Sequence, residues 1–312
     1  MKWGVHMLCE KIVVGSNTEY PLNGILTLPD DIKSPVPAVV MIHGSGPSDM
    51  DEHVMKLTPF KDLAEGLADL GVASIRYDKR TFAHKRKMAK ITPTIKEETI
   101  DDAILAIEML KNDDRIDKNR IFILGHSMGA MLAPRIDAEG GNVAGLIMLA
   151  GTPYRLEDIV IRQLKQAENG NPLVKWIIKR QSIKYTQKFA NLYQMSDEEA
   201  KKTKFAGNVS LYYFKEMGEK TAVDYLLLHE KPTLIMQGER DFQVLHQQDF
   251  AGFKEMLQAR PNTHFKLYPN LNHVFVDAIY DDIMKASKEY KVERHIGKEV
   301  MADITEFIFN CN

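Results

Sequence analysis

The chain has 312 residues, of which 44% are hydrophobic and 27% are charged, and its formal net charge is −2. This balance is typical of an ordinary globular protein and excludes a general electrostatic attraction to nucleic acid or anionic lipid. Because the chain has only two cysteines, Cys9 and Cys311 near its opposite ends, we expect a reducing compartment and no disulfide framework. We find no signal-peptide core and no apolar stretch long enough to cross a bilayer, so we expect a cytoplasmic protein.

The first half of the chain alternates between strand and helix patterns. Short β-rich runs at 11–14 and 24–28 predict an antiparallel edge. Apolar runs of strand length then follow at 37–42, 72–77, 121–124 and 145–150. Between them, Thr58 and Pro59 predict a helix start, and Thr94 with Glu97 predicts a capping box. This alternation predicts an α/β fold with a mostly parallel, doubly wound sheet.

The alternation stops after Pro153 and resumes near residue 231. The sequence between them has helical patterns without a convincing buried strand, which predicts a helical cap insertion over the carboxyl edge of the sheet. We interpret its large aromatic side chains as core and cap packing: Trp176, Phe189, Tyr193, Phe205, Tyr212, Tyr213 and Phe214. Strands at 232–236 and 264–268 and a helix at 300–308 follow. The expected organisation is a core formed by 1–153 and 231–312, with a cap formed by 154–230.

Ser127 is the candidate nucleophile. It is the central residue of Gly125-His126-Ser127-Met128-Gly129, which follows a fully apolar strand and precedes a helical segment. A sharp turn between strand and helix lifts a hydroxyl above the edge of the sheet, and flanking glycines remove the Cβ atoms that would obstruct the backbone. The bland alternative is a tight turn with a capping serine. The strand before it and the helix after it favour the catalytic interpretation.

A serine hydroxyl needs a base to remove its proton and a third group to orient that base. Asp241 and His273 each follow a predicted strand by a few residues, so both are expected at the carboxyl edge of the sheet. The order Ser127, Asp241, His273 is the order found in this architecture. Other acids and histidines are less well placed to serve as members of the triad: His246, Asp249, His264, Asp224 and Glu239. Of these, Glu239 is a possible substitute for Asp241 as the acid.

The oxyanion of a tetrahedral intermediate requires preorganised donors. We expect them to be the backbone N–H groups of Met128, directly after the nucleophile, and of Ser45, in the loop after the third strand. His126 is expected to be structural, because neighbours along a strand point to opposite faces. We see no His, Cys or Asp spacing typical of a metal site, and no metal or organic cofactor is implied.

One stretch of the chain is strongly basic. It contains Lys79, Arg80, His84, Lys85, Arg86, Lys87 and Lys90. We interpret it as a solvated loop, because no interleaved aromatic residues mark a nucleic-acid surface. Phosphate binding would be its alternative role.

These motifs together resemble the α/β-hydrolase superfamily over most of the chain outside the insertion. More narrowly, the chain is similar to bacterial esterases related to dienelactone hydrolase and cinnamoyl esterases. The resemblance rests on four segments: His43 to Pro47 with Asp49 and Asp51, Tyr77 to Arg80, Gly125 to Gly129, and Leu271 to His273. Thr81 and Met50 depart from the family pattern, where glycine and arginine are frequent.

The resemblance implies a serine hydrolase that cleaves short-chain or aryl esters through an acyl-enzyme, with a small-molecule ester as its partner. Two alternatives use the same triad, namely a peptidase and a thioesterase for coenzyme A thioesters. A non-catalytic binding protein is an alternative of another class. The sequence does not fix the oligomeric state, and a homodimer is one of the states that it allows.

Overall fold

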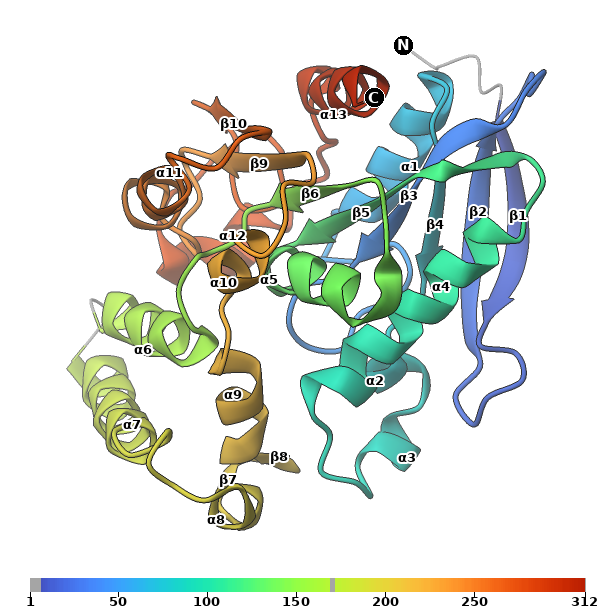
Figure 1. Cartoon of the computed structure of the whole chain (residues 1–312). Coiled ribbons are helices and arrows are strands. Elements are labelled where there is room, and N and C mark those ends of the chain that lie inside the picture. The colour runs from blue at the N-terminus through green and yellow to red at the C-terminus, as the bar shows by residue number, and fades with distance from the viewer. Residues whose placement is uncertain (1–6, 169–171, 312) are drawn as a thin grey trace.

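The computed structural model describes residues 7–168 and 172–311. Its centre is an eight-stranded sheet with the order β1-β2-β4-β3-β5-β6-β9-β10 (Figure 1). The strands β1 and β2 pair in antiparallel fashion, β2 is antiparallel to β4, and all later pairs are parallel. Their bounds are Met7–Val14 (β1), Leu22–Pro29 (β2), Val36–Ile42 (β3), Ala73–Tyr77 (β4), Ile116–His126 (β5), Gly145–Leu149 (β6), Thr233–Gly238 (β9) and Thr263–Tyr268 (β10). The predicted antiparallel edge and parallel sheet are both confirmed.

Helices cover both faces of this sheet. The helices α1 (Pro59–Asp69) and α13 (Lys298–Asn310) pack on one face, and α4 (Asp101–Lys111) and α5 (Met128–Ile136) pack on the other. The central strands are therefore buried on both sides, which explains why β3 and β6 consist of nearly uninterrupted apolar residues. Shorter elements complete the core: α2 (Arg80–Ala83), α3 (Lys85–Met88), η1 (Lys96–Ile100), η2 (Asp137–Gly141), η3 (His246–Phe250), α11 (Ala251–Met256), η4 (Ile283–Lys285) and α12 (Ala286–Glu289).

The predicted helix starts are partly correct. Pro59 is the first residue of α1, but the side chain of Thr58 makes no capping hydrogen bond. Glu97 does accept a hydrogen bond from the backbone N–H of Thr94 at 2.8 Å. That segment begins with the wider turns of η1 before it continues as α4.

The segment between β6 and β9 contains five helices and a hairpin in its described part. These elements are α6 (Leu156–Ala167), α7 (Pro172–Phe189), α8 (Asp197–Lys202), β7 (Lys204–Ala206), β8 (Val209–Ser210), α9 (Leu211–Gly218) and α10 (Ala222–Leu226). The helical pattern hid the hairpin because its strands have three and two residues. Within the described residues, no helix has both the length and the apolar character needed to cross a membrane.

The aromatic residues of this segment divide into two groups. Phe189, Phe205 and Phe214 pack together, with ring centroids 4.6 to 5.5 Å apart. They form an aromatic cluster between α7, the hairpin and α9, as the sequence predicts. Trp176 on α7 is 59% exposed, so the packing interpretation is wrong at this residue.

The basic stretch is not a uniformly solvated loop. Lys79 and Arg80 are buried, and each forms an ion pair with a carboxylate, Glu98 for Lys79 and Asp102 for Arg80. Lys85, Arg86, Lys87 and Lys90 remain exposed. The interpretation as a solvated loop is therefore wrong for Lys79 and Arg80, because carboxylates from η1 and α4 compensate their charges.

Replacing Arg80 by methionine is expected to destabilise the fold. Arg80 donates two hydrogen bonds to Asp102, and burial raises the pKa of Asp102 even though Arg80 opposes this shift. Arg80→Met would leave that carboxyl group buried without its partner, and we expect a loss of about 3 kcal/mol in the free energy of unfolding, measured by urea denaturation. As a control, Lys33→Met removes an exposed pair with Asp31 and should change stability little. Equal effects of the two substitutions would contradict this prediction.

Candidate active site

Ser127 lies at the tip of a sharp turn between β5 and α5. Its backbone has φ of 53° and ψ of −116°, in a region that non-glycine residues rarely occupy. The turn is closely packed, since a Cβ atom on Gly129 would lie 2.1 Å from the carbonyl oxygen of Ile42. A Cβ atom on Gly125 would similarly lie 2.2 Å from the carbonyl oxygen of Gly129. The predicted strand, turn and helix are thus present. Both flanking positions require glycine, because a Cβ atom at either would collide with neighbouring backbone.

His273 and Asp241 lie side by side after neighbouring strands. Asp241 follows β9, His273 follows β10, and the Nδ1 atom of His273 lies 2.7 Å from Oδ2 of Asp241. Both are nearly inaccessible, at 4% and 3% exposure. Because Nδ1 faces a carboxylate, it carries the ring proton of a neutral imidazole, which leaves Nε2 as a base.

Further hydrogen bonds fix the carboxylate of Asp241. Its Oδ1 atom accepts from the backbone N–H groups of Gln243 and Val244, at 2.7 and 2.9 Å. Its Oδ2 atom accepts from the side chain of Gln237 at 2.9 Å. These bonds leave the carboxylate little freedom to turn away from His273.

The alternative acids and histidines for the triad are exposed or contact other groups. Glu239 is exposed, and Asp224 forms the capping box of α10 with Thr221. Asp249 is buried against Thr152 and Arg162. His246 contacts the carbonyl oxygen of Glu239, and the ring of His264 packs against Phe307.

The ring of His126 connects the turn of Ser127 to the loop that carries His273. Its Nε2 atom lies 2.9 Å from the carbonyl oxygen of His273, and the two rings are 4.8 Å apart. His126 is thus structural, as predicted. In the described part of the chain, the hydroxyl of Ser127 is not hydrogen-bonded to His273. Such bonds often form only when substrate is bound.

The loop after β3 lies directly against Ser127. A Cβ atom on Gly44 would be 3.3 Å from Cβ of Ser127. The N–H of Gly44 donates to Oε1 of Glu52 at 2.7 Å, and Oε2 of Glu52 lies 3.0 Å from Nδ1 of His126. Ser45 is the next residue of this loop and borders the same cavity as Ser127 and Met128.

Glu52 is not predicted from the sequence, in which its neighbours Asp49 and Asp51 are the acids that match the family pattern. Asp49 accepts hydrogen bonds from the N–H groups of Asp51 and His53, and Asp51 pairs with Arg76. Glu52 has a positive φ of 52°, which is uncommon for this residue type. No local sequence signal marks Glu52, because its charged partner His126 is distant in the sequence and its contact with Gly44 depends on how the loop folds back.

Buried histidines in this region have shifted pKa values. Burial would lower the pKa of His126, but the carboxylate of Glu52 outweighs this effect and raises it. Burial also opposes ionisation of Glu52, yet contact with His126 leaves the pKa of Glu52 lowered. Burial lowers the pKa of His43 to about 4, so that this ring is neutral where it contacts the carbonyl oxygen of Asp49.

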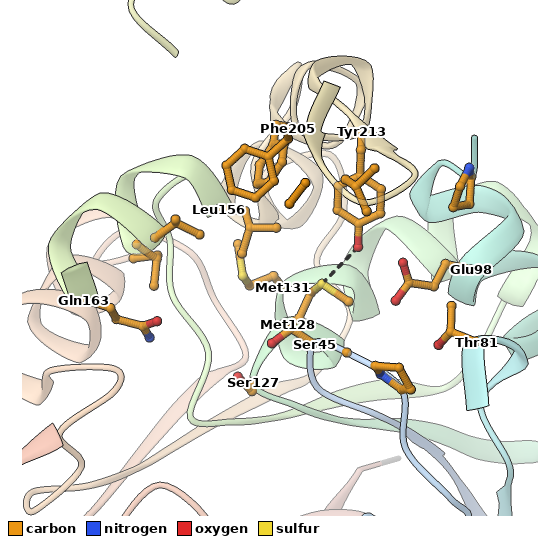
Figure 2. Close-up of a pocket in the computed structure, with 18 of the residues that line it drawn as sticks. Ser45, Thr81, Glu98, Ser127, Met128, Met131, Leu156, Gln163, Phe205 and Tyr213 are labelled. Atoms are coloured by element: carbon orange, nitrogen blue, oxygen red, sulfur yellow. Dashed lines mark hydrogen bonds between the residues drawn. The ribbon is translucent and has the colours of Figure 1, made fainter. Parts of the chain in front are cut away.

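Ser127 opens into a cavity of about 480 Å³. Figure 2 shows Ser127 and Met128 at its base, with Phe205 and Tyr213 on the opposite side, Leu156 and Gln163 at one end, and Thr81 and Glu98 at the other. Much of the wall is apolar and comes from α5, α6, the hairpin and α9: Met128, Met131, Leu156, Ile159, Val160, Phe205, Val209 and Phe214. This volume and lining are typical of a site for a small, largely apolar molecule. Within the described residues, no group of His, Cys, Asp or Glu is arranged to hold a metal ion.

The sheet order, the flanking helices and the serine turn define an α/β-hydrolase, which confirms the predicted fold. The chain also matches the family model described as serine aminopeptidase, S33, over residues 33–277. It therefore belongs to that family.

Two kinds of relative resemble the chain. Esterase EstD of Thermotoga maritima is 32% identical over 287 residues, which is 92% of this chain and 65% of the relative, so the chain spans about two thirds of that protein's length. An esterase of Pyrococcus furiosus superposes with a TM-score of 0.59 at 16% identity, over 100% of this chain and 95% of that one. An acylaminoacyl peptidase of Pyrococcus horikoshii has the same TM-score at 14% identity, over 98% of this chain and 42% of that one. The structural likenesses establish the fold.

The pair formed by Glu52 and His126 is expected to stabilise the protein most at mildly acidic pH. The raised pKa of His126 means that its contribution is complete below the ordinary value of 6.5 and is lost as pH rises through the folded value. The lowered pKa of Glu52 means that its contribution is present above 4.5 and is lost as pH falls.

Glu52→Gln should therefore cost about 3 kcal/mol of unfolding free energy at about pH 6, and less at about pH 9. Chemical denaturation at the two pH values measures the difference. Glu108→Gln, in an exposed pair with Lys111, is the control. A cost for Glu52→Gln that does not change with pH would show that this ion pair does not contribute as described.

Proposed function

We propose that this protein is a serine hydrolase that cleaves carboxylic esters through an acyl-enzyme. The observations that carry the proposal are the buried contact of 2.7 Å between His273 and Asp241 and the position of Ser127 at the base of an apolar cavity. His126, the residue before Ser127, contacts the carbonyl oxygen of His273 at 2.9 Å and so connects the two. Membership of a hydrolase family and 32% identity to an esterase support it.

In this mechanism, the Oγ atom of Ser127 attacks the ester carbonyl carbon and its proton passes to Nε2 of His273. The backbone N–H groups of Met128 and Ser45 stabilise the negative oxygen that forms. Collapse of the intermediate breaks the bond to the leaving alcohol, which takes the proton from His273. Water then attacks the acyl-enzyme with His273 as base, and the carboxylic acid and free Ser127 result. Asp241 keeps the imidazole in the required tautomer throughout.

The charge of the cavity favours an ester over an aminoacyl substrate. Among the described residues that line it, Glu98 is the one carboxylate. Its Oε1 atom lies 2.7 Å from Nζ of Lys79, so its negative charge is already compensated. The free amine of an aminopeptidase substrate would need an uncompensated carboxylate, and this lining offers none.

The thioesterase alternative is weakened by the same ion pairs. Lys79 and Arg80 are bound to Glu98 and Asp102 and are not available to phosphate groups. Lys85 is exposed and lines the cavity, so one basic side chain of this stretch remains accessible there. Hydrolysis of an acyl-coenzyme A in the substrate panel described below tests the thioesterase alternative.

We further propose a cytoplasmic location, supported by the absence of a disulfide between the free Cys9 and Cys311. The proposed partner is a small-molecule ester, with no role for nucleic acid or a membrane. A homodimer remains one of the allowed oligomeric states.

The first test is hydrolysis of a substrate panel by the wild-type protein and by Ser127→Ala. The panel contains p-nitrophenyl esters of increasing acyl length, a feruloyl ester, an aminoacyl anilide and an acyl-coenzyme A. We expect ester turnover that falls at least about 10³-fold in the variant, since the nucleophile is lost. Turnover confined to the anilide or the thioester would overturn the substrate class. If no substrate of the panel is hydrolysed and a phosphonate does not label Ser127, the result would favour a non-catalytic binding protein.

A second test concerns the acid of the triad. Asp241→Asn should lower kcat about 10³- to 10⁴-fold, because the amide no longer holds His273 in the tautomer that accepts a proton at Nε2. Glu239→Gln is the matched control, since Glu239 is exposed, and it should keep kcat within about threefold of the wild type. Steady-state kinetics on the best ester of the panel gives both values. If Glu239→Gln produced the larger loss, Glu239 would replace Asp241 as the acid.

A further inference from the structure

Lys79 is a buried cation that the mechanism above does not use. It follows β4 by two residues and is 2% exposed. Its Nζ atom lies 2.7 Å from Oε1 of Glu98 and donates a hydrogen bond of 2.9 Å to the carbonyl oxygen of Gly44. Lysine is almost never fully buried unless it is paired. Here it is paired and also bound to the loop that carries Ser45.

The carbonyl of Gly44 and the N–H of Ser45 belong to one peptide unit. No cis peptide bond occurs in the described chain. In a planar trans peptide the C=O and the N–H point in opposite directions. Because Lys79 holds the Gly44 oxygen on one side, the N–H of Ser45 is directed to the other. In the described part of the chain, no protein group accepts a hydrogen bond from this N–H.

The preceding peptide unit is fixed as well. The N–H of Gly44 donates to Glu52, which also contacts His126 beside the nucleophile. Gly44 is thus held at its N–H by a buried carboxylate and at its C=O by a buried ammonium group. The loop has no regular secondary structure, and these two side chains hold the two peptide groups that flank Gly44. Further along the loop, the backbone N–H of Lys79 also donates to the carbonyl oxygen of Ser48 at 3.0 Å.

We propose that Lys79 is a positioning residue that aims the N–H of Ser45 at the developing oxyanion. The proposal rests on the ester hydrolysis proposed above. By binding the Gly44 oxygen with a full positive charge, Lys79 also polarises the peptide and strengthens its N–H as a donor. Glu98 compensates the charge of Lys79 and keeps its Nζ atom in place.

Arg80 provides a matched comparison within the same turn. It is the next residue, it is also buried, and it also pairs with a carboxylate of the following helical segment. Its hydrogen bonds go to Asp102, and none reaches the loop of Gly44 in the described structure. A loss that follows merely from breaking a buried ion pair should therefore appear equally in Arg80→Met and Lys79→Met.

The experiment compares Lys79→Met, Glu98→Gln, the double variant Lys79→Met/Glu98→Gln and Arg80→Met. For each we would measure kcat and KM on a p-nitrophenyl ester, and the inhibition constant of a trifluoromethyl ketone that mimics the tetrahedral intermediate. In both variants that lack Lys79, we expect kcat to fall about 10- to 100-fold with KM changed less than about threefold. The affinity for the ketone should fall by the same factor as kcat/KM.

Glu98→Gln keeps the contact between Lys79 and Gly44, so its loss should be smaller than that of Lys79→Met. Arg80→Met should reduce thermal stability but keep kcat within about threefold of the wild type. The double variant removes both charges together and so leaves no uncompensated charge at this position. Circular dichroism establishes that it is folded. If the folded double variant matches Arg80→Met in kcat and in ketone affinity, the positioning role is wrong.

Failure of the inference and failure of the proposed function give different results. If the wild-type protein hydrolyses no ester and a phosphonate does not label Ser127, the proposed function fails. If the wild-type protein is active and loss of Lys79 leaves both kcat and ketone affinity unchanged, the role of Lys79 alone fails.

Discussion

The site depends on one close approach of backbones, between the start of α5 and the end of β3. Gly129 lies so near the carbonyl of Ile42 that no side chain fits between them. This contact places the first turn of α5 directly behind Ser127, whose strained backbone costs of order 1–3 kcal/mol. Burial of the apolar residues of β5, including Phe122 and Leu124, offsets that strain. The positions of Ser127 and of the Met128 N–H are therefore set by the core of the sheet and do not rely on loop contacts.

The other half of the expected oxyanion site has no such support, because Gly44 and Ser45 lie in an irregular loop. Apolar packing has no direction and cannot fix how a peptide group points. Charged side chains can, since their hydrogen bonds are short and directional. The two buried pairs around Gly44, Glu52 with His126 and Lys79 with Glu98, supply this orientation from both sides. Each of these charges is buried and needs its partner, because removal of one partner would leave the other charge buried and uncompensated.

Local patterns in the sequence predict the strands, the serine turn and the pairing of Asp241 with His273. These features follow from short-range periodicity and from the rule that parallel strands end at one edge of the sheet. The sequence does not reveal Lys79 as a buried residue, because it begins a basic run and its partner Glu98 lies in another element. Glu52 is not predicted for the same reason, since its partner His126 also lies in another element. The strands of the hairpin β7–β8 are too short to show a recognisable alternation of apolar and polar residues. What is missed depends on tertiary pairing, which a local pattern does not contain.

The floor of the cavity comes from the edge of the sheet, whereas the opposite wall comes from the segment between β6 and β9. The floor is formed by Ser127 and Met128 of the sheet edge, whereas α6, the hairpin and α9 supply Leu156, Phe205 and Tyr213 (Figure 2). The family that the chain matches is described as serine aminopeptidase, whereas a relative is named as an esterase, so membership of the family does not by itself identify the substrate. Selection must come from the other wall and from the charge within the cavity. Here the charge of Glu98 is compensated, Lys85 is the other charged residue in the described lining, and much of the wall is apolar. In the proposed esterase, shape and apolar contact area therefore contribute most to the choice of acyl group.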